Sequence, residues 1–335
     1  MKKEYLPTFI IIVILLGLLV YYYAFYDSRE EKNTFKEVKV VPTLISKLEN
    51  NSVWCAPFQL IWNDLKNDIV KEDVVFINDE NNQTVLDLNQ ESFKESDISD
   101  NYYYKKHGYM TLDLKKEIEK GLKDKFDEKS DILDQFKFEN NSKNYLLYAM
   151  LYRKFEFVNP FDILDDDTFG INKDSNSILD SNVKVLYYED YNNYAVKLIT
   201  KDHDEVILVK GKNNLNTFNE IYQGLNINQE SNFEEDDTIS INNFNLKLKA
   251  SFPELEKKEI KNSSYYIDQT IQTINFTLDN KGGKVKSEAA MIMKNTAVLS
   301  GRHFNFTDNY VLFLKEENKN IPYFAMKVDN IEKFK

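Results

Sequence analysis

The clearest hydrophobic pattern along the chain is a period-two alternation that predicts two strands joined by a flexible loop. From Thr273 to Leu278, apolar and polar residues alternate as in a strand with one buried face. The chain then passes through Gly282-Gly283, and a second run places Val285, Ser287 and Ala289 on one face. The charged residues of that run fall on the other face: Lys284, Lys286 and Glu288. Such a loop could become a strand wherever a sheet offers it a gap.

Similar patterns predict the coarse organisation of the rest of the chain. Apolar residues recur every four positions from Pro57 to Ile69 and follow one side of Leu112–Phe138, so both segments are expected to be helical. The stretch from Asn78 to Tyr102 is rich in Asn, Asp and Ser and predicts a loop. From Tyr145 onward the alternation typical of strands dominates. The pattern therefore predicts two helical segments before Phe138 and a β-rich region from Tyr145 onward.

The N-terminus predicts a membrane anchor. No residue from Tyr5 to Tyr26 is charged, and this run can cross a bilayer core of ~30 Å at about 1.5 Å per residue. Lys2 and Lys3 favour a cytoplasmic N-terminus. A cleaved signal peptide is the alternative, but no small-x-small site follows the apolar run. We expect an uncleaved single-pass anchor with an extracytoplasmic domain.

This anchor sets the predicted domain boundaries. Residues 1–26 form the transmembrane signal anchor, and residues 27–42 form a charged juxtamembrane linker. Residues 43–335 then form one domain, a length within range for a single large mixed core. The 21 Tyr and 23 Phe of the chain supply a large aromatic core for it.

Charge and cysteine usage exclude several classes of function. A net charge of −12 argues against a nucleic-acid partner, which needs clustered Lys and Arg to neutralise phosphates. The single cysteine, Cys55, excludes an internal disulfide. Its neighbours Val-Trp and Ala-Pro-Phe are mostly apolar, which favours a buried structural thiol over a reactive one.

Motifs for catalysis or metal binding are missing from the sequence. It contains no HExxH, GxSxG, P-loop or paired-cysteine motif, so we expect neither an enzyme nor a cofactor or metal. His107, His203 and His303 lie in polar contexts without ligand spacing and are expected at the surface. The acidic run Glu234–Asp237 either binds a cation such as Ca²⁺ weakly or forms a solvated turn, which is the simpler interpretation.

The region around the glycines resembles the reactive-loop region of the serpin family. Asp279-Asn280-Lys281-Gly282 matches the hinge of that loop, and Ser287 to Met293 matches its proximal part. Phe306 to Leu314 and Tyr323 to Asn330 match the closing strand pair. Four earlier segments match in collinear order: Asn51–Leu60, Asn144–Phe161, the mid-chain strands of Val183–Val209, and Ile239–Leu246.

The resemblance implies an α+β serpin-like fold with an N-terminal helical half, large mixed and antiparallel sheets and an exposed reactive loop. It implies inhibition of a serine-type or cysteine-type endopeptidase of unknown identity by a monomer. The protease cleaves the loop, which inserts as a strand and traps the acyl-enzyme. The alternative is a non-inhibitory serpin-fold module that serves as a binding scaffold at the cell surface.

The resemblance also assigns candidate site residues. The hinge comprises Gly282, Gly283, Val285, Ser287 and Ala289. The scissile bond falls within Lys294, Asn295, Thr296, Ala297, Val298, Leu299 and Ser300. Cleavage after Lys294 would suit a trypsin-like acidic pocket and cleavage after Leu299 an apolar one. Alternatively, these are ordinary loop residues.

Several residues depart from the inhibitory serpin pattern. Where that family opens its sheet, Ala56 and Gln59 replace serines, and Gln272 replaces a histidine. Where the loop enters the sheet, Phe157 replaces a tryptophan, and Phe155 replaces the preceding glycine. Either these residues make different contacts that still hold the sheet closed, or the chain no longer needs contacts that hold it closed.

Overall fold

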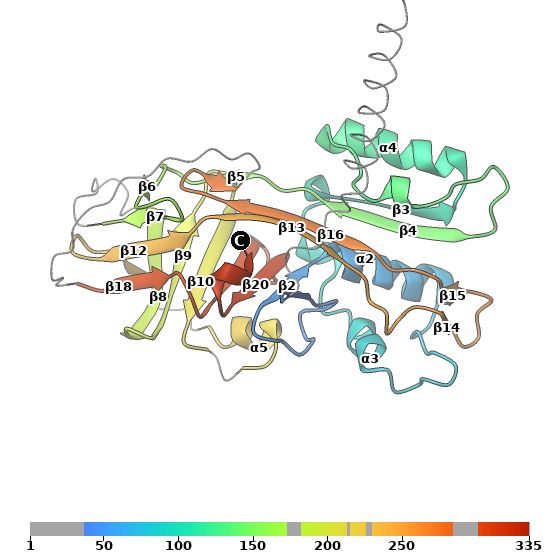
Figure 1. The fold of residues 1–335 in the computed structure, drawn as a ribbon, viewed down its shortest axis with the longest axis horizontal. Helices are drawn as coiled ribbons and strands as arrows, with labels where there is room; N and C mark the ends of the chain where they lie inside the picture. Colours follow the sequence, from blue (N-terminus) through green and yellow to red (C-terminus); the bar gives the residue numbers. More distant parts are fainter. Residues whose placement is uncertain (1–36, 173–181, 213–214, 226–229, 284–300, 335) are drawn as a thin grey trace, which may run out of the picture. The chain divides into compact units, whose positions relative to one another are not determined.

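The computed structural model describes residues 37–172, 182–212, 215–225, 230–283 and 301–334 (Figure 1). They belong to one compact unit that begins at Glu37, so the last part of the predicted linker is folded with the domain. Tyr5 to Tyr26, the predicted anchor, lies outside the described residues. Within the described ranges, no helix has the length and apolar character needed to span a membrane.

An eight-stranded mixed sheet forms the centre of this unit. Only its β1–β2 pair is parallel, and the other neighbours are antiparallel. Every residue of β19 is buried, which is expected for a strand covered on both faces. The strand order is β1 (Lys39–Val40), β2 (Ser52–Cys55), β20 (Phe324–Val328), β19 (Tyr310–Glu316), β10 (Asp204–Lys210), β9 (Asn193–Ile199), β8 (Val183–Asp190) and β11 (Ser231–Asn232).

A four-stranded sheet packs against this sheet through aromatic side chains. The ring of Tyr194 in β9 lies 5.3 Å from the rings of both Phe304 and Phe306, close enough for edge-to-face packing. The order of this sheet is β18 (His303–Phe306), β12 (Thr238–Asn242), β7 (Thr168–Ile171) and β6 (Asp162–Ile163).

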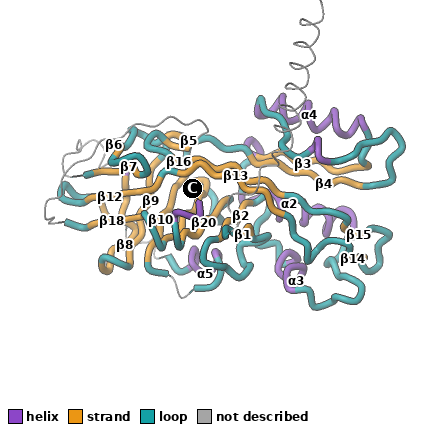
Figure 2. The backbone as a smooth tube through the Cα atoms, viewed as in Figure 1, coloured by secondary structure: helices purple, strands orange, loops and turns teal. Residues whose placement is uncertain are grey.

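The remaining described strands form separate pairs rather than one sheet (Figure 2). Each pair is antiparallel. The pairs are β3 (Tyr103–Tyr109) with β4 (Tyr145–Leu151), β13 (Phe244–Ala250) with β16 (Gln272–Leu278), β14 (Lys258–Glu259) with β15 (Tyr266–Ile267), and β5 (Phe155–Glu156) with β17 (Gly282–Gly283).

Helices are few in the described residues. They are α2 (Pro57–Asp64), which continues as a π-helix over Leu65–Val70, then α3 (Gln83–Asn89), α4 (Leu112–Phe126) and α5 (Phe218–Gln223). Single 3-10 turns cover Glu95–Asp97, Asp100–Tyr102, Leu133–Gln135 and Ile331–Phe334.

Four predicted elements have different limits in the structure. Asn78–Tyr102 is not all loop, because it contains α3. The helix predicted to reach Phe138 ends at Phe126, since Asp127 adopts a left-handed conformation with φ of 58°. Ile239–Leu246 is divided between β12 and β13, and the predicted central strand is divided between β4 and β5. The strand predicted from Thr273 to Leu278 is confirmed as β16.

Candidate functional site: a cleft between two strand pairs

A cleft of about 1200 Å³ lies between β4 and β16. It is lined by all of β4 and by Gln272–Thr277 of β16. Among the described residues, β4 pairs only with β3, and β16 only with β13. Each strand therefore presents one edge of main-chain donors and acceptors without a sheet neighbour, which is the arrangement that accepts an added strand. Figure 1 shows β4 in green and β16 in orange, with α2 in blue.

Helix α2 contributes apolar side chains to the cleft lining. Phe58 and Trp62 are buried, and the helix is amphipathic because its apolar residues recur at helical spacing. Pro57 at the first helical turn costs no hydrogen bond, since that N–H would have no partner within the helix. The π-helix that follows adds Leu65 and Ile69 to the lining.

One end of the cleft is closed by a tight turn between β16 and β17. The N–H of Asp279 donates to the carbonyl oxygen of Gly282 at 2.9 Å, and the N–H of Gly282 donates back at 3.2 Å. The chain then reverses, and Gly282 and Gly283 pair antiparallel with Glu156 and Phe155. The turn thus directs the chain back between β5 and β16.

Gly282 is required by the geometry of this turn. Its φ is +142°, and a Cβ at this position would lie 2.3 Å from the carbonyl oxygen of Phe155. A side chain here would meet both backbone strain and a clash with the neighbouring strand. At Gly283 a Cβ would lie 3.0 Å from the carbonyl oxygen of Thr277 in β16 and 3.0 Å from the Phe155 ring. Gly283 therefore lies between the two strands that frame the closed end.

Aromatic side chains support the closed end. Phe155 and Phe157 are buried, and the Phe157 ring packs 4.8 Å from that of Phe161 and 6.0 Å from that of Phe169. The N–H of Phe157 also donates to the carbonyl oxygen of Lys281 at 2.9 Å. Phe157, the predicted loop-entrance position, therefore holds the turn by both packing and a main-chain hydrogen bond.

The three predicted sheet-opening positions are buried but do not form one cluster. The side-chain Nε2 of Gln272 donates to the carbonyl oxygen of Cys55, next to Ala56, at 3.0 Å. Gln59 points elsewhere, since its Nε2 donates to the carbonyl oxygen of Leu88 at 2.9 Å. Gln272 is thus joined to the residue before Ala56, whereas Gln59 joins α2 to α3.

Gln272 carries an unsatisfied acceptor. Its Oε1 is buried without a hydrogen-bond partner among the described residues, an arrangement that costs ~1–3 kcal/mol. Nearby Cys55 also lines the cleft. Burial raises the pKa of its thiol to about 12, so Cys55 is protonated at neutral pH and is a poor nucleophile.

A buried ion pair links the segment between β4 and β5 to the central sheet. The Nε of Arg153 donates to Asp204 at 2.6 Å, and both side chains are at most 5% exposed. The hydroxyl of Tyr323 donates to the other oxygen of Asp204 at 3.1 Å. Burial raises the pKa of Asp204 to about 6, although Arg153 and Tyr323 act to lower it. This pair anchors Arg153, which lines the cleft, to β10.

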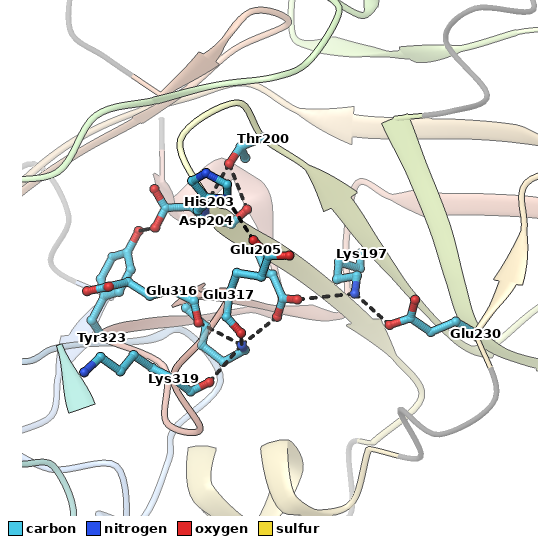
Figure 3. Close-up of polar contacts among 11 residues, drawn as sticks. Lys197, Thr200, His203, Asp204, Glu205, Glu230, Glu316, Glu317, Lys319 and Tyr323 are labelled. Atoms are coloured by element: carbon cyan, nitrogen blue, oxygen red, sulfur yellow. Dashed lines mark hydrogen bonds and ion pairs between the residues drawn. The ribbon is translucent and has the colours of Figure 1, made fainter. Parts of the chain in front are cut away.

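Asp204 also begins a polar network along β10 and β19. Thr200 and Asp204 exchange two hydrogen bonds at 2.8 and 2.9 Å. Glu205, the next residue of β10, pairs with Lys197 at 3.3 Å (Figure 3). It also pairs with Lys315 at 2.7 Å. These contacts fix the strand that carries Asp204.

The structure also describes the residues just after the predicted scissile region. Arg302 donates to both carboxylate oxygens of Asp237, with the shortest contact at 2.6 Å. Asp237 is only 2% exposed, so the prediction of a solvated acidic turn over Glu234–Asp237 is wrong for this residue. The remaining predicted loop residues lie outside the described ranges: Val285, Ser287, Ala289, Lys294, Asn295, Thr296, Ala297, Val298, Leu299 and Ser300.

Sequence reasoning did not identify Arg153 or Asp204 as partners. The two residues are 51 positions apart, and Asp204 lies in a polar local context that is equally typical of a surface. A usable signal was the position of Arg153 directly after the continuous apolar and aromatic run Tyr145 to Tyr152.

The chain matches no protein-family profile and no curated protein. Comparison with solved structures finds mouse protein-Z-dependent protease inhibitor at 11% identity and a TM-score of 0.47, covering 84% of this chain and 91% of that one. Thyroxine-binding globulin in complex with thyroxine matches at 12% identity and a TM-score of 0.40, over 65% of this chain. A serpin from the trematode Schistosoma haematobium matches at 14% identity and a TM-score of 0.38, over 65% of this chain.

The chain spans 64% of thyroxine-binding globulin and 62% of the trematode serpin. The matched structures are serpins, the family that the sequence resembles, and the described fold is serpin-like with mixed sheets and few helices.

Proposed function

We propose that this chain is a membrane-tethered, serpin-like inhibitor of an extracytoplasmic serine-type or cysteine-type endopeptidase. The protease cleaves within Lys294–Ser300, and the segment after Gly283 then enters the cleft as a strand between β4 and β16. Main-chain hydrogen bonds to both strand edges stabilise the inserted segment. As the resemblance implies, insertion traps the acyl-enzyme before water releases it, so the chain acts as a monomeric inhibitor and not as an enzyme.

The observation that carries this proposal is the turn that places Gly283 at the closed end of the cleft. Gly282-Gly283 already pairs with β5, and the chain direction there leads back between the two strand pairs. Extending this pairing by a few residues would bring the following segment alongside the open edges of β4 and β16. Insertion therefore continues an existing strand instead of starting a new one.

The parity of the loop residues supports insertion. A Cβ on Gly283 would point at the buried ring of Phe155. Since side chains alternate along a strand, Val285, Ser287 and Ala289 would share this inward direction. These residues are small or apolar, whereas the charged residues between them would face solvent.

The direct test of inhibition is a covalent complex. The full chain, purified in a mild detergent, is incubated with trypsin-like and subtilisin-like serine proteases and with a papain-like cysteine protease. Denaturing gels should show an adduct with the summed mass of the protease and the cleaved chain. Cleavage without an adduct across the whole panel would contradict inhibition of these protease classes.

Two matched variants separate insertion from simple cleavage. Ser287→Arg places a charge on the inward face and should convert the chain into a substrate that is cut without forming an adduct. Glu288→Arg places the same charge on the outward face and should leave adduct formation intact. Equal behaviour of the two variants would contradict the proposed register.

A non-inhibitory binding module is the second candidate, and the floor of the cleft favours it. Gln272 bridges β16 to the strand that ends at Cys55, and Gly283 is paired with Phe155 of β5. Both contacts oppose widening of the cleft. This candidate predicts that the loop is cleaved without an adduct and without any gain in stability.

Membrane tethering is tested separately. The uncharged run from Tyr5 to Tyr26 supports an anchor with a cytoplasmic N-terminus. The full chain should resist alkaline extraction from membranes, and added protease should digest the domain from the extracytoplasmic side. Release at alkaline pH would contradict the anchor without affecting the argument for insertion.

A further inference from the structure

Three potential metal ligands come together near Tyr145, the first residue of β4, although His107 is far from the other two in the sequence. They are Asp64 at the end of α2, Asp68 in the π-helix and His107 in β3. One ligand atom from each residue lies within 4.8 Å of the other two. Asp64 and Asp68 share a helical face because they are four positions apart.

The His107 ring is held in an orientation suited to a ligand. Its Nδ1 lies 2.8 Å from the hydroxyl of Tyr145, the first residue of β4. With Nδ1–H donating to that hydroxyl, Nε2 carries the free lone pair and lies 3.7 Å from an oxygen of Asp68. An outer hydrogen bond of this kind fixes the tautomer and raises the basicity of metal-binding histidines.

Asp64 provides a buried carboxylate that is only partly engaged. It is 4% exposed, and Lys105 bonds its Oδ1. The hydrogen bonds of the described residues include none to its second oxygen, Oδ2. Lys105 also pairs with Glu95, so the ammonium keeps a carboxylate partner when Asp64 turns toward a cation.

We propose that Asp64, Asp68 and His107 form a binding site for a divalent cation of the zinc class. One imidazole nitrogen and two carboxylate oxygens are ligands typical of Zn²⁺, with water completing a tetrahedron. The two carboxylates balance the charge of the ion. Binding brings the ligand atoms from within 4.8 Å to about 3.3 Å of one another, the separation in a tetrahedral zinc site.

The side chains can make this adjustment by rotation. Asp68 is 55% exposed and can turn toward the Nε2 of His107, whose ring stays in the orientation set by Tyr145. The bound ion would crosslink the α2 region to β3. Among the described residues, β4 pairs only with β3. Tyr145 of β4 both orients His107 and lines the cleft. The ion would therefore hold β4, on one side of the cleft, against the α2 region that also lines it.

The test is titration of the metal-free full chain in detergent with Zn²⁺ alone, followed by calorimetry, and with Co²⁺, followed by visible absorption. We expect one tight site, and a Co²⁺ spectrum characteristic of low-coordinate nitrogen and oxygen ligands. His107→Gln and Asp68→Asn should each abolish this site, and Tyr145→Phe should weaken it by about 10–100-fold. Asp68 is exposed, so its variant is expected to fold normally.

His203 provides the matched control. It lies 2.9 Å from a carboxylate oxygen of Glu317 and is 79% exposed, so it shares the His–carboxylate contact but is outside the three-ligand group. His203→Gln should leave Zn²⁺ affinity and the Co²⁺ spectrum unchanged. Absence of a one-to-one site in the wild type would overturn the proposal, as would a site that survives in folded His107→Gln or is lost in His203→Gln.

Discussion

The two ends of the cleft differ in how completely their strands are paired. At the closed end, β5 and β17 are joined by main-chain pairing and supported by the rings of Phe155 and Phe157. Along the open stretch, β4 and β16 face a cavity of about 1200 Å³. The difference shows that Gly282-Gly283 supplies a pairing strand to β5, whereas β4 and β16 each keep one edge without a sheet neighbour among the described residues. The open stretch has the edges for the same pairing but no strand among the described residues.

The segment between β4 and β5 joins these two regions. Breaking its ion pair between Arg153 and Asp204 should cause the largest loss of unfolding free energy. Arg153→Met leaves Asp204 buried without its cation, and we expect a loss of about 3–5 kcal/mol in unfolding free energy. Urea unfolding at neutral pH measures this loss. Lys201→Met is the control, because the Lys201–Glu156 pair is exposed and worth at most about 1 kcal/mol. Equal losses in both variants would contradict the anchoring role of Arg153.

The titration of Asp204 should appear in the pH dependence of stability. Its pKa in the folded state, about 6, is above the ordinary 3.8. Folding therefore favours the protonated form, so the contribution of this group is fully present below pH 3.8 and is lost as the pH rises through about 6. Between about pH 4.5 and about pH 7.5, wild-type stability relative to Asp204→Asn should fall by about 1–2 kcal/mol. A constant difference across this range would contradict the raised pKa.

Gly282→Ala should damage the closed end while leaving the open stretch intact. The positive φ and the contact with the Phe155 carbonyl predict a loss of about 1–3 kcal/mol. Chemical unfolding measures the loss, and the adduct assay measures its effect on insertion. Gly108→Ala in β3 is the control, since a Cβ there meets only two side-chain carbons of Leu114, at 3.3 and 3.7 Å. The interpretation of the turn is wrong if Gly282→Ala is the milder change.

Gln272→Met should have the smallest effect. The substitution removes one hydrogen bond to the Cys55 carbonyl but also removes the buried Oε1 that lacks a partner. These contributions oppose each other, so we expect a change within about 1 kcal/mol. If Gln272 opposes widening of the cleft, the variant should also form the protease adduct faster. A loss of several kcal/mol in unfolding free energy would instead show that the Gln272 contact strongly stabilises the closed cleft.

Local patterns predicted the elements on both sides of the cleft but not their interruptions. The alternation from Thr273 to Leu278 identified β16 because one face of that strand is buried. The predicted strand from Tyr145 was continued through Arg153, which in the structure turns to a partner on β10. The short helix α3 was missed because the Asn-rich sequence around it is typical of a loop. Only two of its residues, Val85 and Leu88, are buried.

For the turn at the glycines and the cluster around His107, local sequence patterns were likewise informative only about neighbours in the sequence. The two glycines were recognised because a tight turn requires residues that tolerate unusual backbone angles. His107 was expected to lie at the surface without ligands, since its neighbours in sequence offer none. Asp64 and Asp68 come near it only because α2 packs against β4, the sheet partner of β3. Contacts of such long sequence separation depend on the tertiary fold, and a single sequence does not display them.

The most direct test of loop insertion is the melting temperature of the full chain before and after the loop is nicked within Lys294–Ser300. If the freed segment fills the cleft and pairs with β4 and β16, the melting temperature should rise strongly. Ser287→Arg, nicked at the same place, should show little or no rise. An unchanged or lower melting temperature in the nicked wild type would contradict insertion and leave the non-inhibitory binding module as the better account.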